Sequence, residues 1–589
     1  MKKIFNIISF YLILVSPFFL LSCEDYLEVY PKGSASEEVM KENRGVEALL
    51  VGAYDPLNGT GSWREGYDWM MGTVYSDDAD WGGEFLPREM AIYQMAPLMP
   101  AAGSPDWPTS RWDSKYDGVA RANDALKFLR LNQSLEKRLP ENRALTIEAE
   151  ARFLRAYYHF YLQRAFWQIP YIKTVEEMGG KSPEEISNTH PVWDEIETDL
   201  QFAIDNLSET PPVAGEIARA NKFTAMVVKA YAHMIQNEFS EAKPLLDGII
   251  ASGKFKLVDK YYDNYRATTE HNSESIFELE SCVGDGANSG YNAIWENTLM
   301  GHQKGPAAVG WGQFQPTLNL YTAYQTDING LPEVDLKKRD RLVNDIGIAS
   351  AEEYIPTDHL LDPRIDWTIA RRGIPYLDWG IHIGQGWIRE PSWMGPFMSK
   401  KAMHYKSESG LTDYRGRTNA RNFRIFRYAH VLLWRAEIHI EDGEFEAARQ
   451  LINMIRTRAG NEVVMGRCYT YQFDGRPIVV NYDEPAANYK VEPYPEGADA
   501  FSTLEKAREA VRMESRLELA LDGYRFFDLR RWGIDDQVLN DFLEDDRTYP
   551  DRTRYIGITY EKVQDDYWPL PQLQIDLQRG VLTQDPDWQ

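Results

Sequence analysis

Two stretches of the sequence repeat one pattern, "AYAHMIQNEFSEAKPLLDGII" (Ala230–Ile250) and "AEIHIEDGEFEAARQLINMI" (Ala436–Ile455). They align at an offset of 206 residues, which places small, acidic, aromatic and aliphatic residues in register. The aligned pairs are Ala230 with Ala436, Glu238-Phe239 with Glu444-Phe445, Ala242 with Ala448, Leu245 with Leu451, and Ile249 with Ile455. A repeat of this kind has to be considered before any other feature of a fold.

A small residue where two helices cross, an aromatic residue after the turn and an alanine in the second helix are typical of a tetratricopeptide hairpin. Such a hairpin cannot bury its apolar face alone, so several hairpins stack. We therefore predict a mostly α-helical fold, with tetratricopeptide-type helical pairs around 145–255 and 425–460 as its scaffold.

Two further segments have helical periodicity. After Thr146, polar residues recur at steps of three and four and aromatic residues fill the remaining positions, until Pro170 ends the pattern. An apolar stripe with the same spacing begins at Val192. The polar positions of the first segment are Glu148, Arg152, Arg155, His159 and Gln163, and the stripe of the second is Val192, Ile196, Leu200, Ala203 and Leu207.

Long segments around 60–115, 260–425 and 465–500 lack a helical period and are rich in Gly, Pro, Trp and Tyr. We predict that they are irregular loops inserted into the helical scaffold. Binding residues are found disproportionately on loops that a rigid scaffold positions, so these segments are where we expect a ligand site.

The N-terminus has the layout of a secretory signal, with Lys2 and Lys3 ahead of an apolar run from Ile4 to Leu21. The run is also at the lower length limit of a membrane-spanning helix, but Pro17 interrupts it and no basic cluster follows. Leu20-Leu21-Ser22-Cys23 resembles a lipobox, which predicts a signal peptide over 1–22, acylation of Cys23 and a single body over 23–589. An ordinary signal with an incidental cysteine is the alternative. Glu24-Asp25 resembles the signal that sends some lipoproteins to the outer cell surface.

Composition agrees with a large soluble body, since 43% of residues are hydrophobic and 26% are charged. The net charge of −26 falls to −28 once Lys2 and Lys3 are removed, which argues against a nucleic-acid partner. Membrane attachment is predicted through the lipid alone. Cys282 and Cys468 can form at most one disulfide, and we favour two buried free thiols.

The sequence contains none of the motifs that mark a metalloprotease, a serine hydrolase, a phosphate-binding loop or a paired-cysteine metal site. "GDGANSG" from Gly284 has the wrong spacing for a dinucleotide fingerprint. "DDAD" (Asp77–Asp80) offers oxygen ligands but lacks the glycine and terminal glutamate of an EF-hand. We predict no catalytic residue, no metal and no cofactor, although 90 acidic residues leave a glycosidase pair of carboxylates possible in principle.

"ELALDGYRFFDLRRWG" (Glu518–Gly533) holds arginines among acids, and we interpret it as structural rather than catalytic. The predicted ion pairs join four arginines to four nearby acids. The arginines are Arg516, Arg525, Arg530 and Arg531, and the acids are Glu514, Glu518, Asp522 and Asp528.

Tryptophan is concentrated in the loops: residues 61–116 hold five of the 17 Trp of the chain. Two other aromatic groups lie around 291–321 and 367–393. A pyranose ring has apolar C–H faces, so an aromatic plane covers the face while polar side chains bind the hydroxyl rim. Six aromatic residues are instead assigned to the core because they lie at helical positions: Trp112, Tyr116, Trp167, Trp193, Trp434 and Trp532.

The chain also resembles the SusD/RagB family of outer-membrane lipoproteins along its whole length. The matching segments include "CEDYLEVYPKG", "TVYSDDADW", "RWDSKYDGVARANDAL", "AEARFLRAYYHFYLQRAFWQIPYI", "SRLELALDGYRFFDLRRWG" and "WPLPQLQIDLQRGVLTQDPDW". Their order, with the lipobox ahead of them, carries the resemblance. One departure is Trp167-Gln168, where the family often has a glycine.

The resemblance implies a SusD-like fold and a lipid-anchored protein of the outer membrane that faces the exterior. It implies capture of an oligosaccharide or polysaccharide and delivery to a SusC-like TonB-dependent transporter. The candidate ligand contacts are Trp81 with its neighbours Asp80 and Tyr75, then Trp107, Trp295, Trp311 and Tyr321. A cell-surface glycoside hydrolase and a tetratricopeptide scaffold that binds only protein are the alternatives.

Overall fold

The computed structural model of the chain describes most of the protein beyond the N-terminal segment. The described residues are 36–58, 70–80, 82, 107–284, 286, 292–293, 304–306, 310–312, 314–401, 403–413, 417–549, 555–562 and 566–588. Within these ranges, no helix has both the length and the apolar character needed to cross a bilayer.

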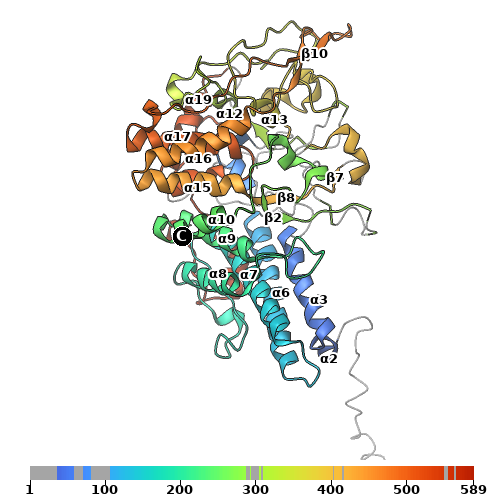
Figure 1. Cartoon of the computed structure of the whole chain (residues 1–589), viewed down its shortest axis with the longest axis vertical. Helices are drawn as coiled ribbons and strands as arrows, with labels where there is room; N and C mark the ends of the chain where they lie inside the picture. The colour runs from blue at the N-terminus through green and yellow to red at the C-terminus, as the bar shows by residue number, and fades with distance from the viewer. Residues whose placement is uncertain are drawn as a thin grey trace, which may run out of the picture.

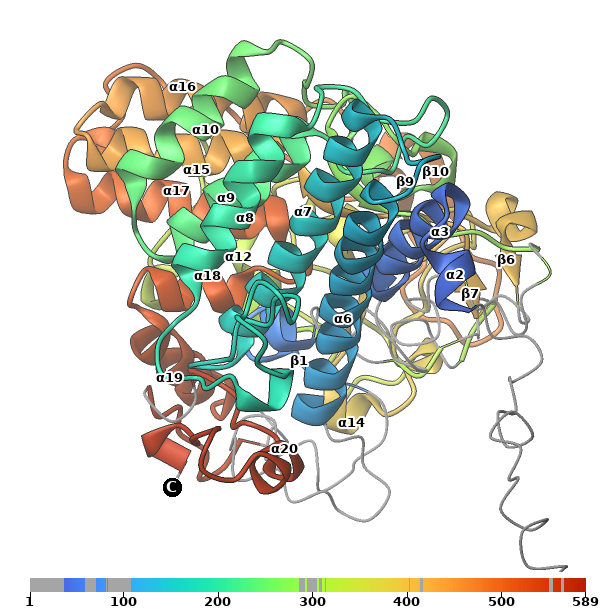
Figure 2. The ribbon, with the colours of Figure 1, turned by 90° about the horizontal axis from the view of Figure 1, so that it is seen from below.

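The fold is mostly helical, as predicted, and its long helices follow one another in space in chain order. Figure 2 shows the first six crossing the molecule side by side, and each one contacts the next. They are α3 (Asn43–Tyr54), α6 (Trp107–Gln133), α7 (Glu141–Ala165), α8 (Trp193–Asn206), α9 (Lys222–Ile235) and α10 (Phe239–Ala251). The array continues from α10 into α15 (Tyr428–Glu441), α16 (Phe445–Ala459) and α17 (Leu504–Leu519).

The two repeated stretches fold into the hairpins α9–α10 and α15–α16. In each hairpin, the small residue of the first helix and the alanine of the second are fully buried. Lys243 Nζ lies 2.7 Å from Asp442 Oδ2, which joins the two hairpins where they stack (Figure 1). The same His–Glu contact closes both turns, from His233 to Glu238 and from His439 to Glu444.

Helix α7 lies in the centre of the helical half, so its polar face is buried rather than solvated. Arg155 Nε donates to Asp199 Oδ2 of α8 at 2.7 Å, and Gln163 Oε1 accepts from the Val192 backbone at 3.1 Å. His159 Nε2 accepts from the Ile172 backbone at 3.0 Å. Burial lowers the pKa of His159 to about 3, so this imidazole is neutral and acts as a packing group. The stripe predicted from Val192 is fully buried against this layer.

The described residues also form five small antiparallel pairs of strands. The pair β2 (Ser275–Leu279) with β8 (Phe423–Arg427) lies between the lower half of the molecule and the upper half in Figure 1. The others are β1 (Ala79–Asp80) with β3 (Gln315–Pro316), β4 (Ile369–Ala370) with β5 (Met398–Ser399), β6 (Thr412–Asp413) with β7 (Thr418–Asn419), and β9 (Met465–Cys468) with β10 (Val480–Pro485).

The remaining helices are short or lie toward the C-terminus. They are α2 (Glu37–Met40), α12 (Leu318–Ala323), α13 (Ile365–Thr368), α14 (Pro391–Met394), α18 (Arg525–Arg531), α19 (Asp535–Asp546) and α20 (Gln572–Leu577).

Three details of the sequence prediction are wrong. Helix α6 begins at Trp107, so the first predicted loop ends earlier than residue 115. Trp167 was assigned to the core, but α7 ends at Ala165 and the Trp167 residue is 37% exposed. Cys282 is exposed, whereas Cys468 is buried as predicted, and both are thiols rather than a disulfide.

Candidate ligand-binding site

A pair of short strands connects the first two tryptophan-rich segments. In this pair Ala79 lies opposite Pro316 and Asp80 lies opposite Gln315. Strand β1 ends immediately before Trp81 in the sequence, and β3 begins four residues after Trp311. The register therefore brings the chain that leads into Trp81 beside the chain that leaves Trp311, although the two are more than 200 residues apart.

The third aromatic segment also lies next to strand β3, through its contact with β5. Strand β3 contacts β5, which follows the segment that contains Trp387. Gly305 lies so close to Trp387 that a Cβ added to the glycine would be 2.7 Å from the indole ring. The φ of Gly305, +90°, also favours glycine at this position. Lys304 Nζ donates to the Arg389 carbonyl at 3.1 Å. All three aromatic segments thus converge on the strands β1, β3 and β5.

Trp311 is the predicted ligand contact that the structure presents to solvent. Trp311 is 36% exposed. Its neighbour Gly312 is buried and has a φ of +72°. Trp81 and Trp295 lie outside the described residues, as does the side chain of Trp107.

Tyr75, Asp80 and Tyr321 have packing roles in this structure. Tyr75 is 3% exposed, and its hydroxyl accepts a hydrogen bond from Trp568 Nε1 at 3.0 Å. Asp80 accepts a hydrogen bond from the Tyr555 hydroxyl. Tyr321 packs against Phe397 with ring centroids 4.6 Å apart and donates to the Val343 carbonyl. All three side chains are enclosed by protein and pack beneath the loops. A ligand could contact them only if the residues that cover them moved.

Most described members of the third aromatic group form a small buried core rather than a surface, while Trp367 belongs to a neighbouring buried cluster. Tyr376 and Trp387 are buried in it together with Met398 and Met403. Trp379 packs on this core and donates from Nε1 to the His404 carbonyl at 2.9 Å. We interpret this cluster as a rigid base beneath the exposed part of the loops.

The arginines after Glu518 are structural, as predicted, but most of their partners are distant in sequence. Arg525 donates to Asp77 twice, from Nε to Oδ1 at 2.8 Å and from Nη2 to Oδ2 at 3.1 Å. Arg516 binds Asp78 at 2.8 Å and Asp77 at 2.9 Å. Within the described part of the chain, Arg531 is the one arginine of the four that pairs as expected, with Asp528 at 2.8 Å, and it also binds Glu437. Two carboxylates of "DDAD", Asp77 and Asp78, are therefore engaged by arginines, and the third, Asp80, accepts from the Tyr555 hydroxyl.

Two groups of residues combine a histidine with two glutamates in metal-ligand geometry among the residues described. His233 lies with Glu197 and Glu238, and His271 lies with Glu278 and Glu280. In each group the imidazole already contacts a carboxylate, at 2.7 Å for His233 and Glu238 and at 2.8 Å for His271 and Glu280. Neighbouring carboxylates raise the pKa of His271 against the opposing effect of burial, which favours an ion pair there.

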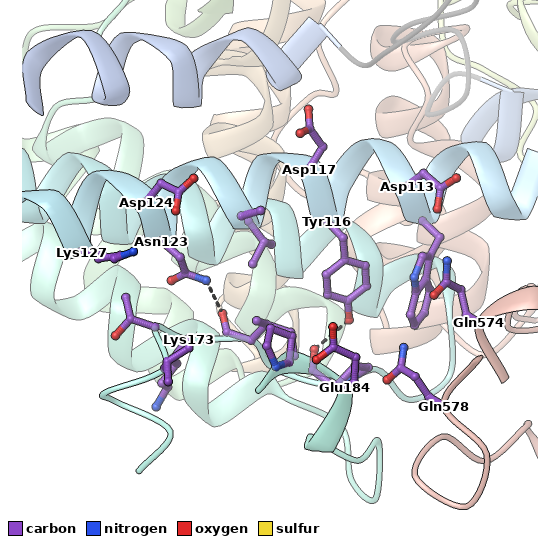
Figure 3. A pocket seen from close by; sticks show the side chains of 18 of the residues that line it. Asp113, Tyr116, Asp117, Asn123, Asp124, Lys127, Lys173, Glu184, Gln574 and Gln578 are labelled. Atoms are coloured by element: carbon purple, nitrogen blue, oxygen red, sulfur yellow. Dashed lines mark hydrogen bonds between the residues drawn. The ribbon is translucent and has the colours of Figure 1, made fainter. Parts of the chain in front are cut away.

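The sequence did not predict a groove of ≈ 840 Å³ between α6, the segment after Pro170, and α20 (Figure 3). Trp112 and Tyr116 line it, with ring centroids 4.6 Å apart. The Tyr116 hydroxyl donates to the Pro170 carbonyl at 2.7 Å, and Asn123 Nδ2 donates to the Ile172 carbonyl at 3.1 Å. These contacts hold α6 against the chain that follows α7, so Trp112 has the core role expected of it.

Comparison with protein families gives two matches that together span most of the chain. Residues 273–588 match the model described as "SusD family". Residues 25–233 match the model described as "Starch-binding associating with outer membrane".

Individual proteins of known sequence or structure are similar over nearly the full length. A SusD-like protein of Formosa agariphila is 24% identical over 550 residues, which cover 90% of this chain and 92% of that protein. A SusD superfamily protein of Bacteroides vulgatus has a TM-score of 0.65 at 19% identity and covers 93% of this chain and 100% of its own. The surface glycan-binding protein A of Bacteroides thetaiotaomicron, solved with laminarihexaose, has a TM-score of 0.62 at 20% identity and covers 92% and 99%. At these identities the structural matches establish the fold.

Proposed function

The chain belongs to the SusD family, and on that premise we propose that it captures an oligosaccharide or polysaccharide on the loops around Trp311 without cleaving it. The observation that carries the proposal is the pairing of β1 with β3, which brings the aromatic segments of the sequence together. Solved proteins of this fold are named as surface glycan-binding proteins, and one was solved with laminarihexaose.

The physical basis is the complementarity of an indole plane to the apolar face of a sugar ring. A tryptophan provides a large rigid surface at a small entropic cost, and recognition energy concentrates on a few such residues. Trp311 lies four residues before strand β3, which pairs with β1 and contacts β5, so the chain that follows Trp311 is held in place. Trp81 and Trp295 remain proposed contacts of the same surface.

Delivery of the bound glycan to a SusC-like TonB-dependent transporter is the second part of the proposal, together with a lipid anchor on Cys23 that places the protein on the cell exterior. The family description "associating with outer membrane" supports this location. The anchor is tested by metabolic labelling with a radioactive fatty acid: we expect incorporation into the wild type and none into Cys23→Ala. Protease treatment of intact cells should then degrade the wild-type protein if it faces outward.

Binding and hydrolysis are separated by one experiment. The purified chain is titrated calorimetrically with a panel of plant, microbial and host glycans, and the same mixtures are assayed for new reducing ends. We expect saturable binding to at least one glycan and no new reducing ends. Release of reducing ends would assign the protein to the glycoside hydrolases, and a lack of binding to every glycan would refute the capture function.

A further inference from the structure

A second cavity, of ≈ 460 Å³, lies between α12, α17, α18, α19 and the segment around Arg339. Basic side chains outnumber acidic ones in its lining, which is unexpected in a chain of net charge −26. The basic residues are Lys337, Lys338, Arg339, Arg512, Arg516 and Arg525, and the acidic residues are Asp77, Asp335, Glu509 and Asp541.

Among the described residues, Arg339 forms no ion pair with a carboxylate, and it is more deeply buried in this cavity than Arg512, whose guanidinium lies over the Trp532 ring. Arg516 and Arg525 are both neutralised by the pair Asp77 and Asp78. Arg339 instead donates from Nε to the Glu333 carbonyl at 3.0 Å and from Nη2 to the Val334 carbonyl at 3.3 Å. Its Nη1 is buried and has no hydrogen-bond partner among the described residues.

The electrostatic surroundings of Arg339 are unfavourable for its charge. Burial, followed by the positive charges of Arg516 and Arg525, lowers the pKa of Arg339 to about 9, against the opposing effect of Asp77. A buried cation in such a place is stabilised by any anion that enters the cavity and binds its open N–H groups.

Asn319 provides an independent observation at the same cavity. The residue is only 3% exposed, yet neither Nδ2 nor Oδ1 has a hydrogen-bond partner within the part of the chain that the structure describes. Its position is fixed, because the Thr317 side chain caps α12 through Leu320 N at 2.9 Å and donates to the Asp77 carbonyl at 2.6 Å. A buried amide without partners destabilises a fold, and native proteins retain few of them.

We propose that this cavity is an anion-binding site that takes an oxyanion group, a sulfate, phosphate or carboxylate, on Arg339 Nη1 and Asn319 Nδ2. The planar guanidinium matches the spacing of two anion oxygens, and the amide supplies a further donor. Lys337 and Lys338 at the mouth of the cavity are largely exposed and pair with Asp541 at 3.4 Å and Asp335 at 3.2 Å, so they partly offset the negative charge of those carboxylates there. The site is distinct from the proposed glycan surface at Trp311, which is not part of its lining.

The test titrates the full-length purified chain with sodium sulfate, sodium phosphate and sodium glucuronate, each against sodium chloride at the same ionic strength. Calorimetry gives the affinity, and the thermal midpoint gives an independent readout. We expect at least one oxyanion to bind saturably. Arg339→Gln should raise its dissociation constant at least tenfold, whereas Arg341→Gln, two residues away and engaged with Asp545 on the surface, should leave it unchanged.

A second variant keeps the test decisive if Arg339→Gln does not fold. Asn319→Leu removes no hydrogen bond found among the described residues, so the midpoint without anion should stay the same or rise, while anion binding weakens several-fold. Saturable binding unaffected by both variants would place the anion elsewhere and refute the site. A linear rise of the midpoint with salt, equal in all variants, would show a general salt effect and would also refute it.

Discussion

The repeated hairpins and the loop-built upper half of the molecule are stabilised in different ways. In the hairpins α9–α10 and α15–α16, buried alanine and aliphatic side chains recur at the same positions, and Lys243 pairs with Asp442 at the surface where the hairpins stack. Near α17, by contrast, buried charges cross-link segments that are far apart in sequence. Glu518 binds Arg364, Arg427 and Arg458, and each of these side chains is 0–3% exposed.

The comparison separates the part of the fold that depends on contacts between residues close in sequence from the part that depends on contacts between distant residues. The repeated pattern of each hairpin lies within some 20 consecutive residues and is mostly apolar, although α16 of the second hairpin also supplies Arg456 and Arg458 to the buried ionic network. The upper half instead depends on single charged residues such as Glu514, which joins Arg364 at 2.7 Å to Arg456 at 2.9 Å. A helical repeat tolerates substitution at most positions, whereas a buried ionic network is sensitive at every member.

The largest effect is therefore expected at the centre of the network. Glu518→Gln should lower the free energy of unfolding by about 3–5 kcal/mol, because it removes the carboxylate that three buried guanidinium groups share and leaves them with an excess of buried positive charge. Although burial alone would raise it, Arg458, Arg427 and Arg364 hold the pKa of Glu518 far below its usual value. Urea unfolding followed by circular dichroism measures the change.

The matched control is Glu446→Gln, which breaks a surface pair with Arg449 of the second hairpin, and it should leave the unfolding midpoint unchanged. A loss of less than 1 kcal/mol for Glu518→Gln would show that the network is not the element that stabilises the upper half.

A smaller effect, dependent on pH, is expected at Lys400 beneath the loops. Its Nζ donates to the Asp366 and Pro375 carbonyls at 2.5 and 2.7 Å, and burial lowers its pKa to about 7. The unfolded chain binds this proton up to a pH of about 10.4, so the Lys400 contribution to stability should increase between about pH 7 and pH 10. Unfolding midpoints at pH 7, 8 and 9 should rise less steeply in Lys400→Met than in the wild type. Parallel curves for the two proteins would contradict the shifted pKa.

The smallest effect distinguishes the two hairpins from each other. At the equivalent turn positions the first has Asn237 with a φ of +59° and the second has Gly443 with a φ of +76°. Gly443→Ala should cost about 1 kcal/mol, because nothing lies near the added Cβ and only the left-handed backbone opposes it. Asn237→Gly should cost less, since both residues tolerate this conformation and the substitution loses only the hydrogen bond from Asn237 Nδ2 to the Arg531 carbonyl at 3.1 Å. An equal loss of stability in the two variants would contradict the inference that the left-handed backbone at Gly443 depends on glycine.

The hairpins could be predicted from the sequence and the loop-built upper half could not, because only the hairpins depend on contacts between residues close in sequence. Residues 230–250 and 436–455 carry a helical period and a repeated small-residue pattern, so their hairpins could be predicted from local sequence. The contact of Arg525 with Asp77 could not, because it joins residues 448 positions apart and no local pattern marks it. Similarly, Trp311 was selected among aromatic residues by its loop surroundings. Tyr75 and Tyr321 were selected in the same way, yet they are buried because long-range packing covers them.

The proposed glycan surface is tested most directly by two tryptophans of equal exposure. Trp311, 36% exposed, lies beside the converging strands, and Trp167, 37% exposed, follows α7 in the helical half. Calorimetric titration of the glycan that binds the wild type should give a dissociation constant at least tenfold higher for Trp311→Ala, and an unchanged one for Trp167→Ala. Unchanged affinity in Trp311→Ala, or an equal loss in both variants, would contradict the assignment of ligand binding to the tryptophan loops.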